Sequence, residues 1–304
     1  MILACGEALI DMLPRTSTLG EAAFAPHAGG AVFNTAVALG RLGAEVGLFS
    51  GISTDMLGEI LIDSLTAAGV DTSHAARSAR PTTIALVKLV DGHATYAFYD
   101  ENTAGRMLSE GDLPDAQADC YFFGGISLVA EPCGAVYEAL QARVAPQAVT
   151  MIDPNIRPSF ITDEGAYRAR VARMIACADI VKVSDEDLHW IMGNGDIADL
   201  AAQVCATGPA LVCVTEGSKG ARGFGRVAQA QVAATPVTVV DTVGAGDTFN
   251  AGVLHALQSA GLLTKDALAN LSDAQIATAL SLGTRTAAIT VSRAGANPPW
   301  SHEL

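Results

Sequence analysis

The stretch Asp241-Thr-Val-Gly-Ala-Gly-Asp-Thr-Phe-Asn-Ala-Gly252 decides the fold class. It follows an apolar, β-branched run from Val237 to Val240 and leads into apolar residues at helical spacing between Phe249 and Leu257. This pattern predicts a strand, a glycine turn and the start of a helix. Gly244 and Gly246 allow the backbone to lie close against a ligand. The first amides of the helix lack intrahelical partners and lie at the positive end of its dipole, so the turn suits a phosphate.

Asp247 stands in the middle of this turn. A carboxylate beside an anion site repels the ligand's charge, and a base that takes a proton from a nucleophile arriving at the phosphate would explain its presence. The alternative is a helix cap assisted by Thr248. No Gly-Lys-Ser/Thr follows the turn, so it is not a Walker A loop.

Composition excludes several classes of protein. The chain has 304 residues, half of them hydrophobic, with a net charge of −14 and a pI of about 4.7. Nucleic-acid binding calls for a basic face, so we expect no nucleic-acid partner and attribute the acidity to solubility. No basic segment precedes the apolar N-terminal residues, and no apolar run approaches the roughly 20 residues of a membrane helix. We therefore expect no membrane partner and a cytoplasmic location. The six scattered cysteines predict free thiols rather than a metal site or disulfides.

The order of elements predicts one α/β domain over residues 1–304, with a mostly parallel sheet covered on both faces. The opening strand is expected over Ile2–Leu13. Further strands are expected at 120–123, 149–153, 180–183 and 211–215, with a β-rich stretch at 221–240. Helices are expected at 133–144, 164–177, 185–192, 198–206, 247–260 and 273–290.

A hairpin interrupts this alternation. Thr82–Val90 and Thr95–Tyr99 alternate in strand fashion around Asp91-Gly92, a turn signal. With residues 12–28 it predicts a small β lid over a ligand, spanning about 12–28 and 81–104. The cluster from Tyr99 to Asn102 suits a polyhydroxyl ligand or is a solvated loop.

Polar groups early in the chain are candidates for the ligand site. Asp11 follows the opening strand, where it either caps a turn or binds a hydroxyl. The pair Gly29-Gly30 precedes a helix and allows close backbone approach, and Asn34 offers both a donor and an acceptor. Asp55 is expected to cap a helix. The first strand lacks a following G-x-G-x-x-G, which disfavours a nicotinamide dehydrogenase.

Three later turns also follow strands. The group containing Asn155 and Arg157 offers a guanidinium that is either solvated or bound to a phosphoryl or sugar oxygen. The second group is either an acidic helix start or an outer-sphere Mg²⁺ site, and the third is either a nucleotide-binding turn or a plain β-turn. They are Asp153-Pro-Asn155-Ile-Arg157-Pro, Lys182-Val-Ser184-Asp185-Glu186-Asp187 and Thr215-Glu-Gly217-Ser-Lys-Gly220.

Together these residues resemble the ribokinase/PfkB family of carbohydrate kinases nearly from end to end. The stretch 241–252 resembles the family's C-terminal signature, and Gly29 to Gly51 resembles its N-terminal one. The resemblance implies a three-layer α/β sandwich with a small β lid. It also implies that Asp247 is the general base and that the amides of Gly244, Ala245 and Gly246 form an anion hole.

Other roles follow from the same resemblance. Substrate binding is assigned to Asp11, Gly29, Gly30, Asn34, Tyr99 and Asn155, with Arg157 assisting catalysis. The ATP side is assigned to Lys182, Ser184, Thr215, Gly217 and Gly220. Mg²⁺ bound through water is assigned to Glu186 and Asp187, and a monovalent cation such as K⁺ to Asp241, Val243 and Gly295. The family's usual Asn-x-x-Glu is Ser184-x-x-Asp187 here, which keeps the charge on a shorter arm, and Glu186 could share the role.

The expected activity is transfer of the γ-phosphoryl group of MgATP to a primary sugar hydroxyl. Within the family, Asp153 to Pro158, Tyr99 to Asn102 and the stretch ending at Asn297-Pro are similar to bacterial fructokinases, so fructose is the expected acceptor. The alternatives are a 2-keto-3-deoxygluconate kinase, another sugar kinase of the family, or a catalytically silent ligand-binding protein on the same fold. A homodimer through the lid is a further expectation.

Overall fold

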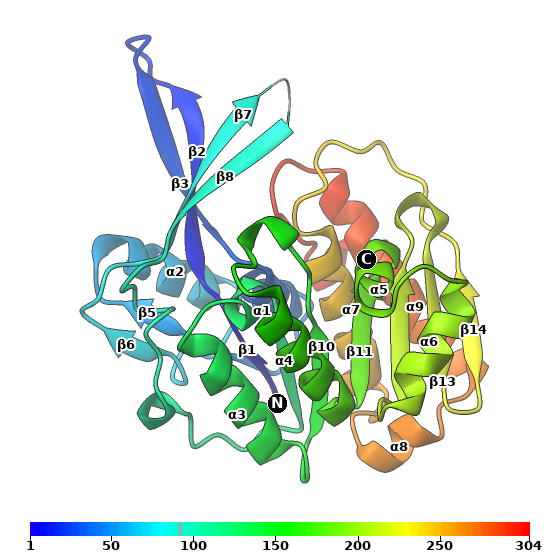
Figure 1. Cartoon of the computed structure of the whole chain (residues 1–304). Helices are drawn as coiled ribbons and strands as arrows, with labels where there is room; N and C mark the ends of the chain where they lie inside the picture. The colour runs from blue at the N-terminus through cyan, green and yellow to red at the C-terminus, as the bar shows by residue number, and fades with distance from the viewer. Residues whose placement is uncertain (91–92) are drawn as a thin grey trace.

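The computed structural model describes residues 1–90 and 93–304, and the side chains of all residues except 88–96. Its centre is an eight-stranded sheet in the order β14-β13-β12-β11-β10-β9-β1-β4 (Figure 1). The strands from β4 to β12 are parallel, and β13 and β14 are antiparallel additions at one edge. Their bounds are β1 Ile2–Cys5, β4 Val46–Phe49, β9 Cys120–Gly124, β10 Val149–Asp153, β11 Ile180–Ser184, β12 Leu211–Thr215, β13 Ala221–Gly225 and β14 Gln229–Val232.

Helices cover both faces of this sheet, which confirms the expected three-layer α/β sandwich (Figure 1). Alternate residues of β1 enter two different cores: Ile2 and Ala4 lie in one, Leu3 and Cys5 in the other. The first core is covered by α1 Ala31–Arg41, α2 Met56–Ala67, α7 Ala245–Ser259 and α9 Asp273–Val291, with α8 Lys265–Ala269 at its end. The second is covered by α3 Cys133–Val144, α4 Glu164–Cys177, α5 Asp185–Met192 and α6 Ile197–Ala206.

Local sequence explains where many helices begin. Asp163, Asp196 and Ser272 are N-caps whose side chains accept backbone amides of α4, α6 and α9. Asp55 caps α2 in the same way, as expected, by accepting from the amides of Leu57 and Gly58. Short 3₁₀ turns connect other elements: η1 Glu110–Asp112, η2 Ile126–Leu128, η3 Pro158–Phe160, η4 Gly217–Lys219 and η5 Ser301–Glu303.

A separate four-stranded sheet stands beyond one end of the main sheet, in blue and cyan in Figure 1. Its order is β3-β2-β7-β8, with β2 Leu9–Thr16, β3 Ala22–Gly29, β7 Ile84–Val90 and β8 His93–Tyr99. We call it the lid sheet. The expected turn at Asp91-Gly92 lies outside the described residues. A third, two-stranded sheet pairs β5 Gly51–Ser53 with β6 Ala76–Ser78.

Two predicted strands were wrong. The opening strand over Ile2–Leu13 is two strands, because the chain leaves the main sheet at Gly6, where a Cβ would lie 2.4 Å from Val32 Cγ2, and enters the lid sheet at Leu9. Residues 237–240 form no strand, and the side chains of Val239 and Val240 are each 60% exposed. Their apolar character therefore has another cause, which lies in the site.

Candidate active site

The N-terminus of α7 is where two cavities meet. One, of about 510 Å³, is bordered by α1, the lid sheet and the turn after β10. The other, of about 600 Å³, is bordered by the turn after β12, residues 234–239 and α9. Thr242, Ala245 and Gly246 line both. We call the first the acceptor cavity and the second the nucleotide cavity.

Asp247 lies at this junction and lines the acceptor cavity. One carboxylate oxygen, Oδ2, accepts a hydrogen bond from Nδ2 of Asn34 at 2.9 Å, and the backbone carbonyl accepts one from Oγ1 of Thr35 at 3.2 Å. Asp247 does not cap α7, because it is the third residue of the helix and Gly244, at φ 78°, occupies the N-cap position. The cap interpretation of its side chain is therefore set aside.

Burial raises the pKa of Asp247 to about 7, and the nearby carboxylate of Asp153 raises it further, against the hydrogen bond from Asn34 and the charge of Lys182. A carboxylate with a pKa near 7 is well matched to accept a proton at neutral pH. The arrangement supplies a general base that faces the acceptor cavity.

The helix terminus beside Asp247 offers amides to an anion. Among the described residues, the amides of Gly246 and Asp247 have no hydrogen-bond acceptor, whereas Ala245 donates to the carbonyl of Thr242 at a long 3.3 Å. A Cβ at Gly244 would approach that of Ala296 to 2.8 Å, and one at Gly246 would lie 3.0 Å from Nζ of Lys182. Glycine is thus required where the turn packs most closely.

A buried charge pair supports this terminus from below. Nζ of Lys182 lies 2.9 Å from Oδ2 of Asp153, and both side chains are almost fully buried. The same oxygen accepts from Nδ2 of Asn250 at 2.7 Å. Burial alone would lower the pKa of Lys182, but the pairing with Asp153 outweighs it and raises the pKa, so the ammonium remains charged. It places a fixed positive charge beneath Gly246.

The acceptor cavity is lined by most of the predicted sugar-binding residues. Asp11, Gly30, Asn34, Asn155 and Arg157 all border it. Gly29 does not, but a Cβ there would lie 2.4 Å from Oδ2 of Asp11, so this glycine leaves room for that carboxylate. Burial raises the pKa of Asp11 to about 6.

The sequence-based choice of Tyr99 points to the wrong face of its strand. Tyr99 is 59% exposed and does not line the cavity, whereas its neighbour Phe98 does. Successive side chains of a strand alternate between faces, so only one of the two can border the ligand. Phe160, Ile126 and Glu7 also line the cavity and were not predicted, because nothing in an apolar side chain's local sequence marks it as part of a site.

The nucleotide cavity is lined by Thr215, Gly217 and Gly220, as expected. Lys182 and Ser184 are not among its lining residues. Ser184 instead caps α5 by accepting from the amide of Asp187 at 2.9 Å. Val237 and Val239 line the cavity, which explains an apolar run that belongs to no sheet.

The residues assigned to cations lie in two places. Asp241 accepts the amides of Val243 at 3.0 Å and Gly295 at 2.9 Å, which brings that predicted trio together. Asp187 is buried beside Asp153, accepts no hydrogen bond among the described residues, and has a pKa raised first by burial and then by Asp153. Glu186 is exposed. A single carboxylate of this kind fits Mg²⁺ held mainly through water and substrate oxygens.

Within the described residues, no group of three or more His, Cys, Asp or Glu side chains is placed to hold a metal ion without other ligands. The six cysteines are free, with Cys177 exposed and Cys205 half-buried. No helix in the described part of the chain is both long and apolar enough to cross a membrane.

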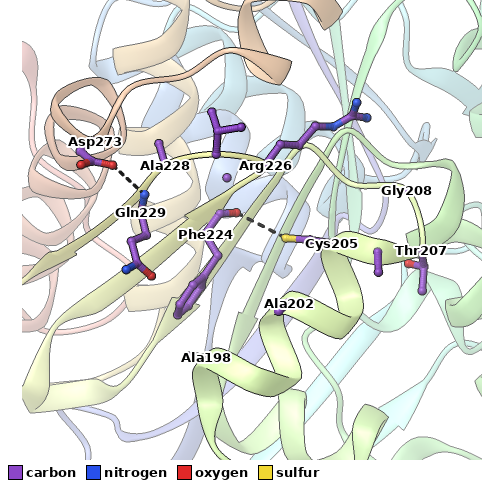
Figure 2. A pocket seen from close by; sticks show the side chains of 13 residues that line it. Ala198, Ala202, Cys205, Thr207, Gly208, Phe224, Arg226, Ala228, Gln229 and Asp273 are labelled. Atoms are coloured by element: carbon purple, nitrogen blue, oxygen red, sulfur yellow. Dashed lines mark hydrogen bonds between the residues drawn. The ribbon is translucent and has the colours of Figure 1, made fainter.

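Another hollow, of about 900 Å³, lies away from these residues, between α6 and the β13–β14 hairpin (Figure 2). Its internal contacts are a hydrogen bond from Sγ of Cys205 to the carbonyl of Phe224 at 3.5 Å and one from the amide of Gln229 to Asp273 at 2.8 Å. None of the predicted site residues lines it.

A base between a nucleotide-sized cavity and a polar acceptor cavity, beside free helix amides, defines a phosphotransferase that acts on a hydroxyl group. Comparison with known proteins agrees: the pfkB family of carbohydrate kinases matches residues 1–303, and the chain belongs to that family.

Individual relatives narrow the similarity. The chain is 56% identical over 275 residues to a fructokinase of Rhizobium leguminosarum bv. trifolii, covering 90% of this chain and 84% of that protein. A fructokinase of Xylella fastidiosa, solved with bound ATP, superimposes with a TM-score of 0.87 at 29% identity, over 97% of this chain and 93% of that one. A fructokinase of Vibrio cholerae O395, solved with fructose, ADP and calcium, gives a TM-score of 0.83 at 27% identity, over 97% and 94%.

Proposed function

We propose that this protein is an ATP-dependent fructokinase that transfers the γ-phosphoryl group of ATP to a primary hydroxyl of fructose. The observation that carries the proposal is Asp247, a buried base at the junction of the two cavities. The 56% identity to a fructokinase supports the choice of sugar.

In the proposed reaction, the acceptor hydroxyl lies against Asp247, which takes its proton as the oxygen attacks the γ-phosphorus. The amides of Gly246 and Asp247, with Lys182 beneath them, stabilise the charge on the transferring group. Arg157 lines the acceptor cavity and supports the same charge or a sugar oxygen. Phosphoryl transfer passes through a loose transition state, so positioning and electrostatic stabilisation supply most of the rate.

We propose Mg²⁺ as the divalent cofactor, with Asp187 and the exposed Glu186 as its carboxylates. Bound there, the ion would neutralise charge on the nucleotide phosphates. The trio around Asp241 would hold K⁺ or another monovalent cation. A measurement of ADP release with Mg²⁺ varied at constant ATP, and separately with K⁺ replaced by choline, tests both assignments.

We further propose that the lid sheet closes over the acceptor cavity and excludes water, as part of a single domain spanning the chain. Its outer part carries exposed apolar side chains, Leu19 at 84% and Phe24 at 51%, which support a homodimer formed through the lid. Sedimentation of Phe24→Glu against the unaltered protein tests this. Because the donor is ATP and the cysteines are free, we propose action in the cytoplasm.

The test of function is a coupled ADP-release assay with MgATP against fructose, 2-keto-3-deoxygluconate, ribose, tagatose, glucose and adenosine. Turnover confined to fructose supports the proposal. Turnover of 2-keto-3-deoxygluconate alone would assign the other branch of the family. Tight ATP binding without turnover of any acceptor would contradict the proposed activity and favour a silent binding protein.

A further inference from the structure

A second cavity adjoins the acceptor cavity at the end away from the nucleotide. It measures about 370 Å³ and shares Phe98, Ile126 and Phe160 with the acceptor cavity. None of residues 242–247 lines it. The nucleotide cavity, the start of α7, the acceptor cavity and this second cavity therefore follow one another, and the three shared apolar residues form the last boundary.

Two aromatic rings close this boundary. Phe98 comes from β8 of the lid sheet and Phe160 from η3 of the main body, and their ring centroids lie 4.7 Å apart at 65°. This edge-to-face geometry is favourable for aromatic pairs. Because the rings come from the lid and the body, the boundary depends on where the lid sheet stands.

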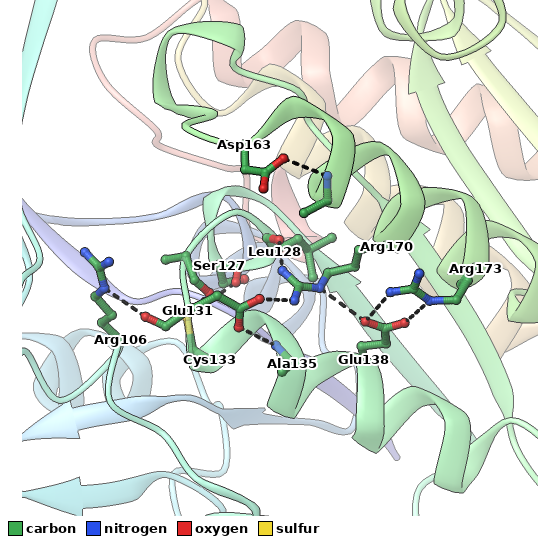
Figure 3. Close-up of polar contacts among 12 residues, drawn as sticks. Arg106, Ser127, Leu128, Glu131, Cys133, Ala135, Glu138, Asp163, Arg170 and Arg173 are labelled. Carbon is green, nitrogen blue, oxygen red and sulfur yellow. Dashed lines mark hydrogen bonds and ion pairs between the residues drawn. The ribbon is translucent and has the colours of Figure 1, made fainter.

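The second cavity is polar but its cations are already paired. Arg106 binds the carboxylate of Asp100 at 3.0 Å and the carbonyl of Glu131 at 3.0 Å. Arg170 pairs with Glu131 and with Glu138, and donates to the carbonyl of Leu128 at 2.9 Å (Figure 3). No arginine among the described lining residues is left for a phosphate or carboxylate.

One lining group does lack a partner. Tyr167 is 3% exposed, and its hydroxyl makes no hydrogen bond with any described residue. Burial raises its pKa well above the ordinary value of a tyrosine, so it remains a neutral hydroxyl group. Buried hydroxyls are normally paired, and this one suits a neutral, hydroxylated group that enters the cavity.

We propose that the Phe98–Phe160 pair sets the length of the sugar that this kinase accepts, and that the second cavity behind it takes a neutral extension of the sugar once the pair is opened. The inference rests on the proposed function. A fructose whose C6 hydroxyl lies at Asp247 presents its C1 end to the opposite side of the ring, where the pair stands. Substituents on O1 of fructose therefore meet the two rings.

The test compares kcat/KM for fructose, 1-O-methylfructose and 1-O-propylfructose in the unaltered protein, Phe160→Ala, Phe160→Leu and Tyr99→Ala. Overfilling a pocket by one or two methylenes lowers kcat/KM by about 10-fold or more. We expect the unaltered protein to show that loss with the propyl ether. Phe160→Ala should recover at least about 10-fold of it relative to fructose, and Phe160→Leu less.

Tyr99→Ala removes the neighbouring ring on the other face of β8 and should keep the unaltered ratio of propyl ether to fructose. In the Phe160→Ala background, a 3-hydroxypropyl ether should exceed the propyl ether by about 10-fold, and Tyr167→Phe should abolish that difference.

An unchanged ratio in Phe160→Ala, with fructose turnover retained and the melting temperature preserved, would overturn the inference. Equal recovery in Tyr99→Ala would do the same, because the effect would not belong to the pair. Absence of fructose turnover in the unaltered protein is a different failure: it would overturn the proposed function and, with it, this inference.

Discussion

Nδ2 of Asn34 donates a hydrogen bond to Oδ2 of Asp247 at 2.9 Å, although the two residues lie 213 positions apart in the chain. Asn34 comes from the first turns of α1 and Asp247 from the first turn of α7, and the two helices pack side by side on one face of the sheet. The contact holds one carboxylate oxygen of the base and lowers its pKa, against the larger effect of burial.

Asp247→Ala should lose about 10²-fold or more in kcat, the scale of general-base catalysis, while ATP binding persists. The amides of the helix terminus remain in this variant, so the nucleotide affinity measured by calorimetry should stay within a few-fold of the unaltered value. A variant with near-normal turnover would refute the role of Asp247.

The pH dependence of kcat/KM should show an acidic limb near pH 7, because Asp247 must be ionised to accept a proton and its pKa is raised to about 7. Below that value the rate should fall about tenfold per pH unit. Asn34→Ala removes a hydrogen bond to the ionised form, so the limb should move to higher pH. A limb that stays in place would show that Asn34 does not act on the titration of the base.

The same shift predicts a cost to stability. The folded-state pKa of Asp247 exceeds its ordinary value of 3.8, so the native state binds the proton more tightly than the unfolded chain. Stability from this group is therefore present below pH 3.8 and lost as pH rises through 7. Asp247→Asn should be more stable than the unaltered protein at pH 8, by up to a few kcal/mol at about 1.4 kcal/mol per pKa unit. This difference should shrink towards pH 4 in urea titrations.

Lys182→Met should lower the free energy of unfolding by about 3–5 kcal/mol, because it leaves the carboxylate of Asp153 buried and unpaired. The double variant Lys182→Met, Asp153→Asn should recover part of that stability in denaturant melts but not the turnover, since the charge beneath Gly246 is still missing. Full recovery of turnover in the double variant would contradict the electrostatic role of Lys182.

Gly252→Ala should destabilise the fold by about 1–3 kcal/mol, the usual cost of overpacking. Gly252 lies where α7 meets α9, and a Cβ there would be 2.7 Å from Cα of Gly283. Gly165→Ala is the matched control, since its Cβ would lie 3.5 Å from the nearest atom and α4 should gain helix propensity. Thermal melts of the two variants should move in opposite directions or leave the control unchanged.

The regular elements were readable because each depends on local periodicity. The expected helices at 133–144 and 164–177 have the same bounds in the structure, as do the strands at 149–153 and 211–215. The failures have one cause in common: an apolar residue does not state what will bury it. Residues 237–240 were read as a strand, yet Val237 and Val239 line the nucleotide cavity.

The sequence by itself determined the glycine turn, the position of the base and the alternation of strands and helices, because these follow from backbone freedom and side-chain spacing within a few residues. Only the tertiary structure decided that Asn34 meets Asp247, that Lys182 lies beneath Gly246, and that Phe98 rather than Tyr99 faces the acceptor. Those relations depend on how helices and sheets pack across more than a hundred residues, and no local pattern carries that information.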